Sequence, residues 1–226
     1  MNLPFSSAAR ARVIPFAVFM LLLQLRGMAP ADGSWGVDPR WIYGLTVLVV
    51  SALLALWWRE YGELAAQEWP SWREAWLAIG IGLLVFALWI QLDATWMQLA
   101  APTATFTPLD AQGALIWPMV AVRWIGAALL VPVMEELFWR SFLMRWFQSQ
   151  TFEGVAPQRV GARAIVLSTF VFMLAHTLWL AAIVAGLAYA WLYVRTGKLW
   201  VPVIAHAVTN GALGIWVVAT GNWAFW

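Results

Sequence analysis

The residues best suited to chemistry begin with two adjacent glutamates, in the sequence EELFWR at positions 135–140. On a helix, Glu136 and Arg140 lie four residues apart on one face, whereas Glu135 points about 100° away. The arginine can therefore hold one carboxylate while the other stays free. A free carboxylate in a cavity of low dielectric constant has a raised proton affinity and suits general-base work on water. The alternative is that both glutamates lie at the inner membrane interface, solvated beside Arg140 and Arg145.

The chain contains two histidines, and each lies four residues from a second residue of interest. His176 follows Phe172 in an otherwise mostly apolar run, where a histidine that merely packs against Phe172 is an alternative to a catalytic one. His206 precedes Asn210, so an imidazole and a carboxamide share one helix face and can donate hydrogen bonds to the same small target. Two such donors would form an oxyanion hole. A polar contact between two helices is the alternative for this pair.

Taken together, these residues include every part needed for peptide hydrolysis without a serine or cysteine nucleophile. A chain that places both of its histidines in apolar segments, beside a glutamate pair and an asparagine, favours function over packing, because ionisable groups inside a membrane are costly.

The elements that must position these residues are membrane-spanning helices. Of the 226 residues, 63% are hydrophobic and 11% are charged, and the mean hydropathy is +0.76. Soluble domains have about 25% charged residues, so this chain is too apolar to be one. The absence of cysteine excludes disulfides and metal sites that need sulfur ligands. The net charge of +2 comes from basic residues scattered at segment ends, which argues against nucleic acid as a partner.

The hydropathy pattern predicts an all-α, polytopic transmembrane bundle of about seven to eight spans. We place spans near residues 12–29, 41–58, 75–92, 114–133, 163–179, 181–195 and 199–218. A helix over 132–147 continues the fourth span, with a kink expected at Pro132. Residues 1–113 form N-terminal spans and an outer loop, residues 114–226 form the catalytic core, and the two make a single membrane unit.

Lysine and arginine set the orientation, because cytoplasmic loops hold them in excess. With the N-terminus inside, ten of the thirteen basic residues fall on inner segments: Arg10, Arg12, Arg59, Arg73, Arg140, Arg145, Arg159, Arg163, Arg195 and Lys198. We therefore predict a cytoplasmic N-terminus and a site in the cytoplasmic half of the bilayer. Many of the nineteen tryptophans fall at predicted span ends, as in an aromatic belt.

The three motifs resemble those of the CAAX-protease and bacteriocin-processing family, the type II CAAX prenyl endopeptidase-like glutamic intramembrane proteases. The family pattern is a double Glu with Arg four after the second, a Phe with His four later, and a His with Asn four later. The residues that stand at these positions are Glu135, Glu136 and Arg140, then Phe172 and His176, then His206 and Asn210. The resemblance covers about residues 114–220. The context of residues 189–200 also looks like the branch associated with bacterial C-terminal sorting (exosortase-like) systems.

The resemblance implies an intramembrane endopeptidase in which Glu135, aided by His176, activates water. It also implies that His206 and Asn210 stabilise the oxyanion. Glu136 and Arg140 would pair and orient the site, with Phe172 in support. The implied protein lies in a bacterial inner membrane and cleaves a membrane-associated protein or peptide; in a bacterium, a prenylated CAAX tail is not the expected substrate.

Three alternatives stay open at the level of the sequence: a zinc-dependent form of the same protease, a non-catalytic membrane protein and, ranked last, a small transporter that uses the ionisable residues as a proton or ion relay. Glu135, His176 and His206 could ligate zinc with one position left for water, although asparagine is a poor zinc ligand and the His206–Asn210 pair suits an oxyanion better. We therefore expect no cofactor. A non-catalytic membrane protein, such as a bacteriocin immunity factor, is the second alternative.

Overall fold

The helices of the bundle follow the predicted spans closely. The computed structural model describes residues 6–30, 34, 36, 38–99 and 106–226, and in this part of the chain it contains helices and no strands. The helices are α1 (Ser7–Met28), α2 (Trp41–Leu56), α3 (Trp72–Trp89), α4 (Trp117–Ile125), α5 (Val131–Glu136), α6 (Arg145–Gln148), α7 (Ala162–Leu174), α8 (Trp179–Thr196) and α9 (Trp200–Thr220). The all-α prediction is confirmed.

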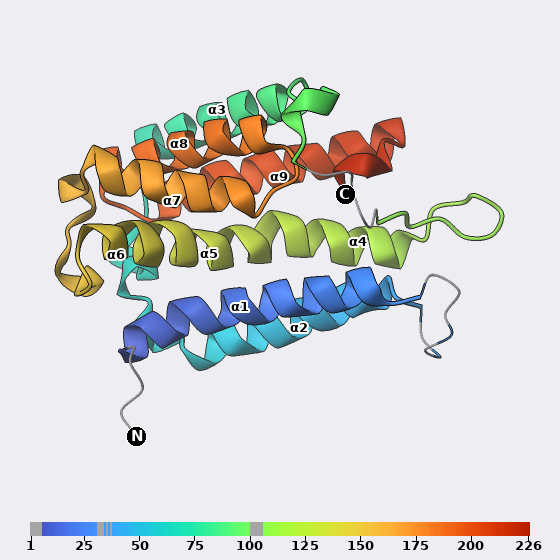
Figure 1. Cartoon of the computed structure of the whole chain (residues 1–226), viewed down its shortest axis with the longest axis horizontal. Helices are drawn as coiled ribbons and strands as arrows, with labels where there is room; N and C mark the ends of the chain where they lie inside the picture. The colour runs from blue at the N-terminus through green and yellow to red at the C-terminus, as the bar shows by residue number, and fades with distance from the viewer. Residues whose placement is uncertain (1–5, 31–33, 35, 37, 100–105) are drawn as a thin grey trace.

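Five helical segments are long and apolar enough to cross a bilayer. They are Ser7–Met28, Trp72–Trp89, Trp117–Gln148, Trp179–Thr196 and Trp200–Thr220, and α2 and α7 are shorter apolar helices. All of them run roughly along the long axis of the molecule, with their connections gathered at its two ends (Figure 1). Five helices begin with tryptophan, at residues 41, 72, 117, 179 and 200, as expected for aromatic belts at both interfaces. The chain is an integral membrane protein.

The long helix Trp117–Gln148 lies between two groups of helices (Figure 1). The pair α1 and α2 covers one side, and α3, α7, α8 and α9 cover the other. Helices α3 and α9 approach each other closely, since a Cβ atom added at Gly82 would lie 2.4 Å from the carbonyl oxygen of Ala205. Only glycine fits there, because no real Cβ contact is that short. Gly186 of α8 likewise lies against Thr169 of α7, and such small residues let membrane helices approach closely.

The predicted fourth span and its continuation form one helix. The helix runs through Pro132 without a break (Figure 1), and the turns before and after α5, Gly126–Leu130 and Leu137–Met144, are π-helical. In the first of them, the backbone N–H of Val131 donates to the carbonyl of Gly126, five residues back. The wider turn accommodates a proline ring that would otherwise clash with the preceding carbonyl.

The end of the span predicted over 163–179 lies beyond the end of the helix in the structure. Helix α7 ends at Leu174, and His176 lies in the connection to α8 rather than inside a helix. The last turn is tighter than an α-helical turn, because the N–H groups of Ala175 and His176 donate to carbonyls three residues back, at Phe172 and Met173. The apolar run alone does not mark this end, because the helix stops inside it.

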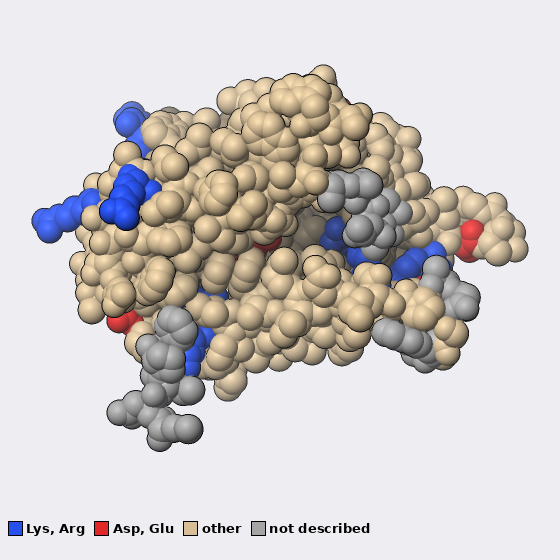
Figure 2. Space-filling model, in the orientation of Figure 1, with Lys and Arg blue, Asp and Glu red and all other residues tan. Residues whose placement is uncertain are grey.

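Figure 2 shows basic side chains at the end of the bundle that holds the N-terminus of α1, and others in the central hollow and toward the opposite end. Two of the ten are not free surface cations, however. Arg12 and Arg140 are buried, with 4% and 3% exposed area, and each forms an ion pair with a glutamate. The orientation argument therefore depends on the other eight.

A buried ion pair fastens α1 to the loop after α2 and to the long helix. Arg12 Nη2 lies 2.6 Å from Glu63 Oε2, and Arg12 Nε donates to Ser141 Oγ at 2.9 Å. The Ser141 hydroxyl also donates to Glu63. Burial by itself would raise the pKa of the Glu63 carboxyl, but the charge and hydrogen bonds of Arg12 and the hydroxyl of Ser141 outweigh it, so this pKa lies below its ordinary value.

We expect Glu63→Gln to lower the stability of the bundle by about 2 kcal/mol at neutral pH, because it removes charge-assisted hydrogen bonds and leaves Arg12 without its counter-ion. A carboxyl with a lowered pKa stabilises the fold above its unfolded value, and this contribution disappears as the pH falls through the folded value. The difference between wild type and variant, measured by tryptophan-fluorescence melting in detergent, should shrink on acidification. Glu68→Gln is the control. A difference that stays constant down to strongly acidic pH would contradict this.

Candidate active site

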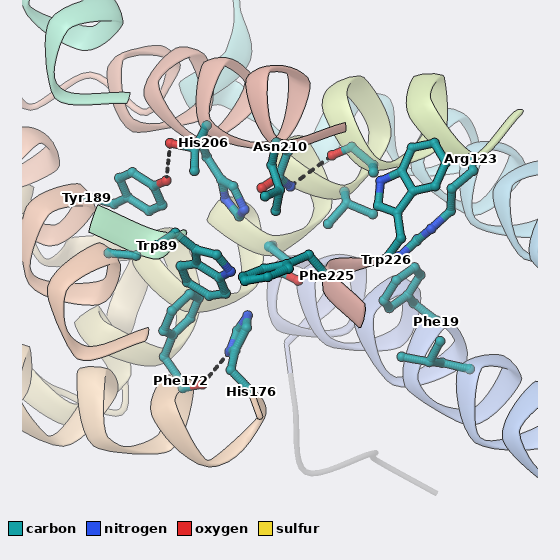
Figure 3. A pocket seen from close by; sticks show the side chains of 17 residues that line it. Phe19, Trp89, Arg123, Phe172, His176, Tyr189, His206, Asn210, Phe225 and Trp226 are labelled. Atoms are coloured by element: carbon teal, nitrogen blue, oxygen red, sulfur yellow. Dashed lines mark hydrogen bonds between the residues drawn. The ribbon is translucent and has the colours of Figure 1, made fainter. Parts of the chain in front are cut away.

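All four predicted catalytic residues line one cavity. The cavity has a volume of about 200 Å³, and its wall includes Glu135, His176, His206 and Asn210 together with Phe172 (Figure 3). The side chains come from the long helix, the α7–α8 connection and α9. The face seen in Figure 2 is hollowed near its middle, and acidic and basic side chains are visible inside the hollow. The other two predicted residues, Glu136 and Arg140, lie behind the wall.

Glu136 and Arg140 form the predicted pair. Arg140 Nη1 lies 3.1 Å from Glu136 Oε1, and the two side chains have 3% and 0% exposed area. Arg140 also donates from Nη2 to the carbonyl of Gly186 at 3.3 Å, and its guanidinium lies 4.8 Å from the ring centre of Phe172. The arginine thus connects the long helix to α7 and α8.

The same carboxylate holds His206. Nδ1 of His206 lies 2.9 Å from Glu136 Oε1, and the imidazole stacks on the ring of Tyr189 at 5.0 Å. A carboxylate oxygen only accepts hydrogen bonds, so Nδ1 carries the proton. Nε2 is then the atom that faces the cavity (Figure 3). A neutral His206 presents a lone pair there, and a protonated one presents a donor balanced by Glu136.

His176 is held in the same way by its own chain. Its Nδ1 donates to the carbonyl of Phe172 at 2.7 Å, and the two rings lie 4.2 Å apart. The early end of α7 makes this bond available, because the N–H of His176 bonds to Met173 instead of Phe172. The Nε2 atom of His176 also points into the cavity and, in the neutral ring, accepts a proton (Figure 3).

Asn210 is oriented by a carbonyl that Pro132 leaves without a helical partner. The Nδ2 atom of Asn210 donates to the carbonyl of Ala127 at 2.9 Å. The N–H of Val131, the usual partner of Ala127, turns back to Gly126, and Pro132 has no N–H to offer. One hydrogen of the carboxamide is thereby used, and the second remains as a donor.

Glu135 is not entirely without a partner. Trp139, four residues later, donates from its indole Nε1 to Glu135 Oε2 at 3.2 Å. The indole restricts the carboxylate but leaves Oε1 without a hydrogen bond from the described residues. Glu135 and Glu136 thus face different environments, a cavity for the first and an ion pair for the second, as their spacing predicts.

Three supporting residues were missed from the sequence. Trp139 could have been identified from the sequence, because it follows Glu135 by four residues, the same spacing that identified the Glu136–Arg140 pair. Tyr189 and Thr209 have none: the hydroxyl of Tyr189 donates to Thr209 Oγ1 at 2.7 Å, and Thr209 in turn contacts the carbonyl of Gly82 at 2.8 Å. This chain of bonds fixes the ring on which His206 stacks to both α3 and α9.

The zinc alternative needs three ligands within reach of one ion. Among the described residues, no group of three or more His, Asp or Glu side chains is arranged to hold a metal ion. Glu135, His176 and His206 share the cavity wall without forming such a group. We therefore assign no step to a metal.

Comparison with known proteins gives a match over the part of the chain that holds the candidate site. Residues 116–212 match the model of the family described as type II CAAX prenyl endopeptidase Rce1-like, and this range contains all seven motif residues. No curated protein and no solved structure matches the chain. The likeness to the C-terminal sorting branch is outside what the match addresses and stays a prediction. Over residues 116–212, less than half of its length, the chain is thus similar to the Rce1-like type II CAAX prenyl endopeptidase family.

Proposed function

We propose that this protein is a glutamic intramembrane endopeptidase that hydrolyses a peptide bond in a membrane-associated protein or peptide. The match to the Rce1-like family over residues 116–212 supports a membrane protease of the CAAX type in general. The observation that carries the finer proposal is that two imidazoles present Nε2 to the cavity that Glu135 and Asn210 also line. We further propose that the protein lies in a bacterial inner membrane with its N-terminus in the cytoplasm.

In this mechanism Glu135 removes a proton from water, and the oxygen attacks the carbonyl carbon of the substrate. Nε2 of neutral His176 accepts a hydrogen bond from the same water or takes the proton onward. As the carbonyl π bond breaks, negative charge develops on its oxygen, and protonated His206 and the second Asn210 hydrogen donate to it. When the C–N bond breaks, the proton held by Glu135 or His176 passes to the leaving amine. The products are a carboxylate and an amine.

Glu136 decides which role each histidine has. Its carboxylate lies 2.9 Å from His206 Nδ1 and stabilises an imidazolium, whereas His176 bonds to a neutral carbonyl at Phe172 and gains no such counter-charge. The geometry therefore supports His206 as the charged donor and His176 as the neutral acceptor.

Glu135→Gln should lower the cleavage rate by about 10²- to 10⁴-fold while the protein remains folded, because the amide cannot take a proton. The measurement compares the protein termini in membranes of cells that carry wild type or variant, together with melting temperatures of the two purified proteins. Glu68→Gln makes the same chemical change outside the cavity and should leave cleavage intact. If the Glu135→Gln variant is well folded and the protein termini in its cells are the same as in cells with the wild type, the protein is not a protease. That result would favour the immunity-factor alternative.

Glu136→Gln should differ from Glu135→Gln by also damaging the fold. It leaves Arg140 buried without a counter-ion and removes the acceptor of His206, a loss of roughly 3–5 kcal/mol for a broken buried pair. Melting curves of both variants make the comparison. Equal stability of the two variants would show that Glu136 and Arg140 do not form the buried pair.

Metal dependence is tested separately. We expect cleavage to survive chelators and the purified protein to contain no stoichiometric metal, since each catalytic step above uses only protein groups and water. Elemental analysis and activity after dialysis against chelator provide the measurement. One zinc per chain, with activity that is lost on chelation and restored by zinc, would replace the metal-free mechanism with the zinc alternative.

A further inference from the structure

Arg123 has no role in the mechanism, yet it lies in the wall of the same cavity (Figure 3). No acidic side chain among the described residues pairs with it, and its Nε atom is buried without a hydrogen-bond partner there. A guanidinium inside a membrane helix is costly and is usually retained for a function.

The contacts of Arg123 with two aromatic rings leave its Nε donor without a hydrogen bond to the described residues. Its Cζ atom lies 4.5 Å from the ring centre of Tyr43 and 5.8 Å from that of Phe106. Aromatic rings stabilise the charge without accepting the in-plane N–H groups. The hydroxyl of Tyr43 is also buried without a partner among the described residues. A held cation with an unused donor is suited to binding an anion.

The position of Arg123 relative to Glu135 indicates the direction in which a bound peptide would extend along the long helix. Arg123, Ala127, Val131 and Glu135 all line the cavity, and they follow one another at intervals of four residues along one continuous helix. Positions four apart drift sideways on an ideal α-helix, and the wider π-helical turn over Gly126–Leu130 reduces that drift. The stripe spans at most roughly 18 Å of helix axis. An extended peptide rises about 3.3 Å per residue, so three to five residues cover this span once side-chain reach is allowed for.

We propose that Arg123 binds a carboxylate of the peptide substrate, about three to five residues from the bond that Glu135 attacks. The carboxylate belongs either to an acidic side chain or to the C-terminus of the substrate. The inference depends on the proposed endopeptidase function. A lipid phosphate would use the same donors, but a stripe that leads from Arg123 to Glu135 along one small cavity favours a group on the substrate.

The test uses the full chain with Glu135→Gln, in nanodiscs, so that binding is measured without turnover. The probes are fluorescent, membrane-partitioning peptides that differ in the position of a single Asp, each matched with its Asn counterpart, and each made with a free or an amidated C-terminus. One carboxylate position should bind about tenfold to a hundredfold more tightly than its neutral counterpart, the range for a hydrogen bond to a charged group. Adding Arg123→Gln should abolish this preference, and Arg123→Lys should restore part of it.

Arg163→Gln is the matched control, because Arg163 is exposed at the start of α7 and loses the same charge. It should leave the preference unchanged. Absence of any carboxylate preference, a preference that survives Arg123→Gln, or failure of every peptide to bind would each overturn the inference. So would a variant that loses co-purified anionic lipid while its peptide preference stays the same, since that assigns Arg123 to a lipid phosphate.

Failure of the endopeptidase proposal looks different. If Arg123 determines a carboxylate preference but the chain that retains Glu135 cleaves no peptide, the binding site is supported and the endopeptidase proposal is contradicted. Cleavage of the Asp and Asn peptides with equal kcat/KM would support the endopeptidase proposal and contradict carboxylate binding by Arg123. If both proposals hold, Arg123→Gln should lower kcat/KM for the Asp peptide to the value of its Asn partner and leave the Asn peptide unaffected.

Discussion

One carboxylate, that of Glu136, organises the catalytic half of the molecule. It is fully buried and lies within 3.1 Å of a guanidinium on its own helix and within 2.9 Å of an imidazole on α9. A buried charge persists only where other charges and donors compensate it, so the positions of Arg140 and His206 depend on Glu136 and on each other. Arg140 then reaches α8 through Gly186, and His206 reaches it through Tyr189. A single ionic centre thus fixes how the long helix, α8 and α9 meet.

His176 and Asn210 show how backbone irregularities create a polar site inside apolar helices. Helix α7 has 13 residues and is about 20 Å long, too short for the roughly 30 Å of hydrocarbon. Its last turn therefore ends inside the bundle and delivers His176 to the cavity. Pro132 and the π-helical turn before it release the carbonyl of Ala127, which orients Asn210. Unsatisfied backbone groups cannot face lipid, so both irregularities are tolerated because they are turned toward the cavity and bonded there.

The sequence was sufficient for the helices and for the identity of the site residues, because both follow from short-range regularities. Hydropathy located every long helical segment to within a few residues, and four-residue spacing identified the Glu136–Arg140 pair. The end of α7 and the bond from Asn210 to Ala127 were not accessible in this way. The first depends on a local competition for the carbonyl of Phe172, and the second on a contact between residues 83 positions apart. Burial of Arg12 was equally hidden, since a basic residue near a span end looks the same whether it meets lipid headgroups or Glu63.

Glu135 and Arg123 have opposite relations to their surroundings, although they share one face of one helix. Glu135 lines the cavity and accepts a hydrogen bond from Trp139 on one oxygen only, whereas Arg123 lies against the rings of Tyr43 and Phe106 with its Nε donor unused. Each would be destabilising in a protein selected only for stability, because each leaves ionic bonding capacity unfilled in an apolar environment. At the Glu136 centre, the opposite charges of Glu136 and Arg140 compensate each other, although Glu136 Oε2 and Arg140 Nη1 form no hydrogen bond with the described residues. The long helix therefore separates two tasks along its length. The ion pair behind the cavity wall stabilises the bundle, and the cavity face keeps a base and a cation available to a substrate that supplies the missing partners.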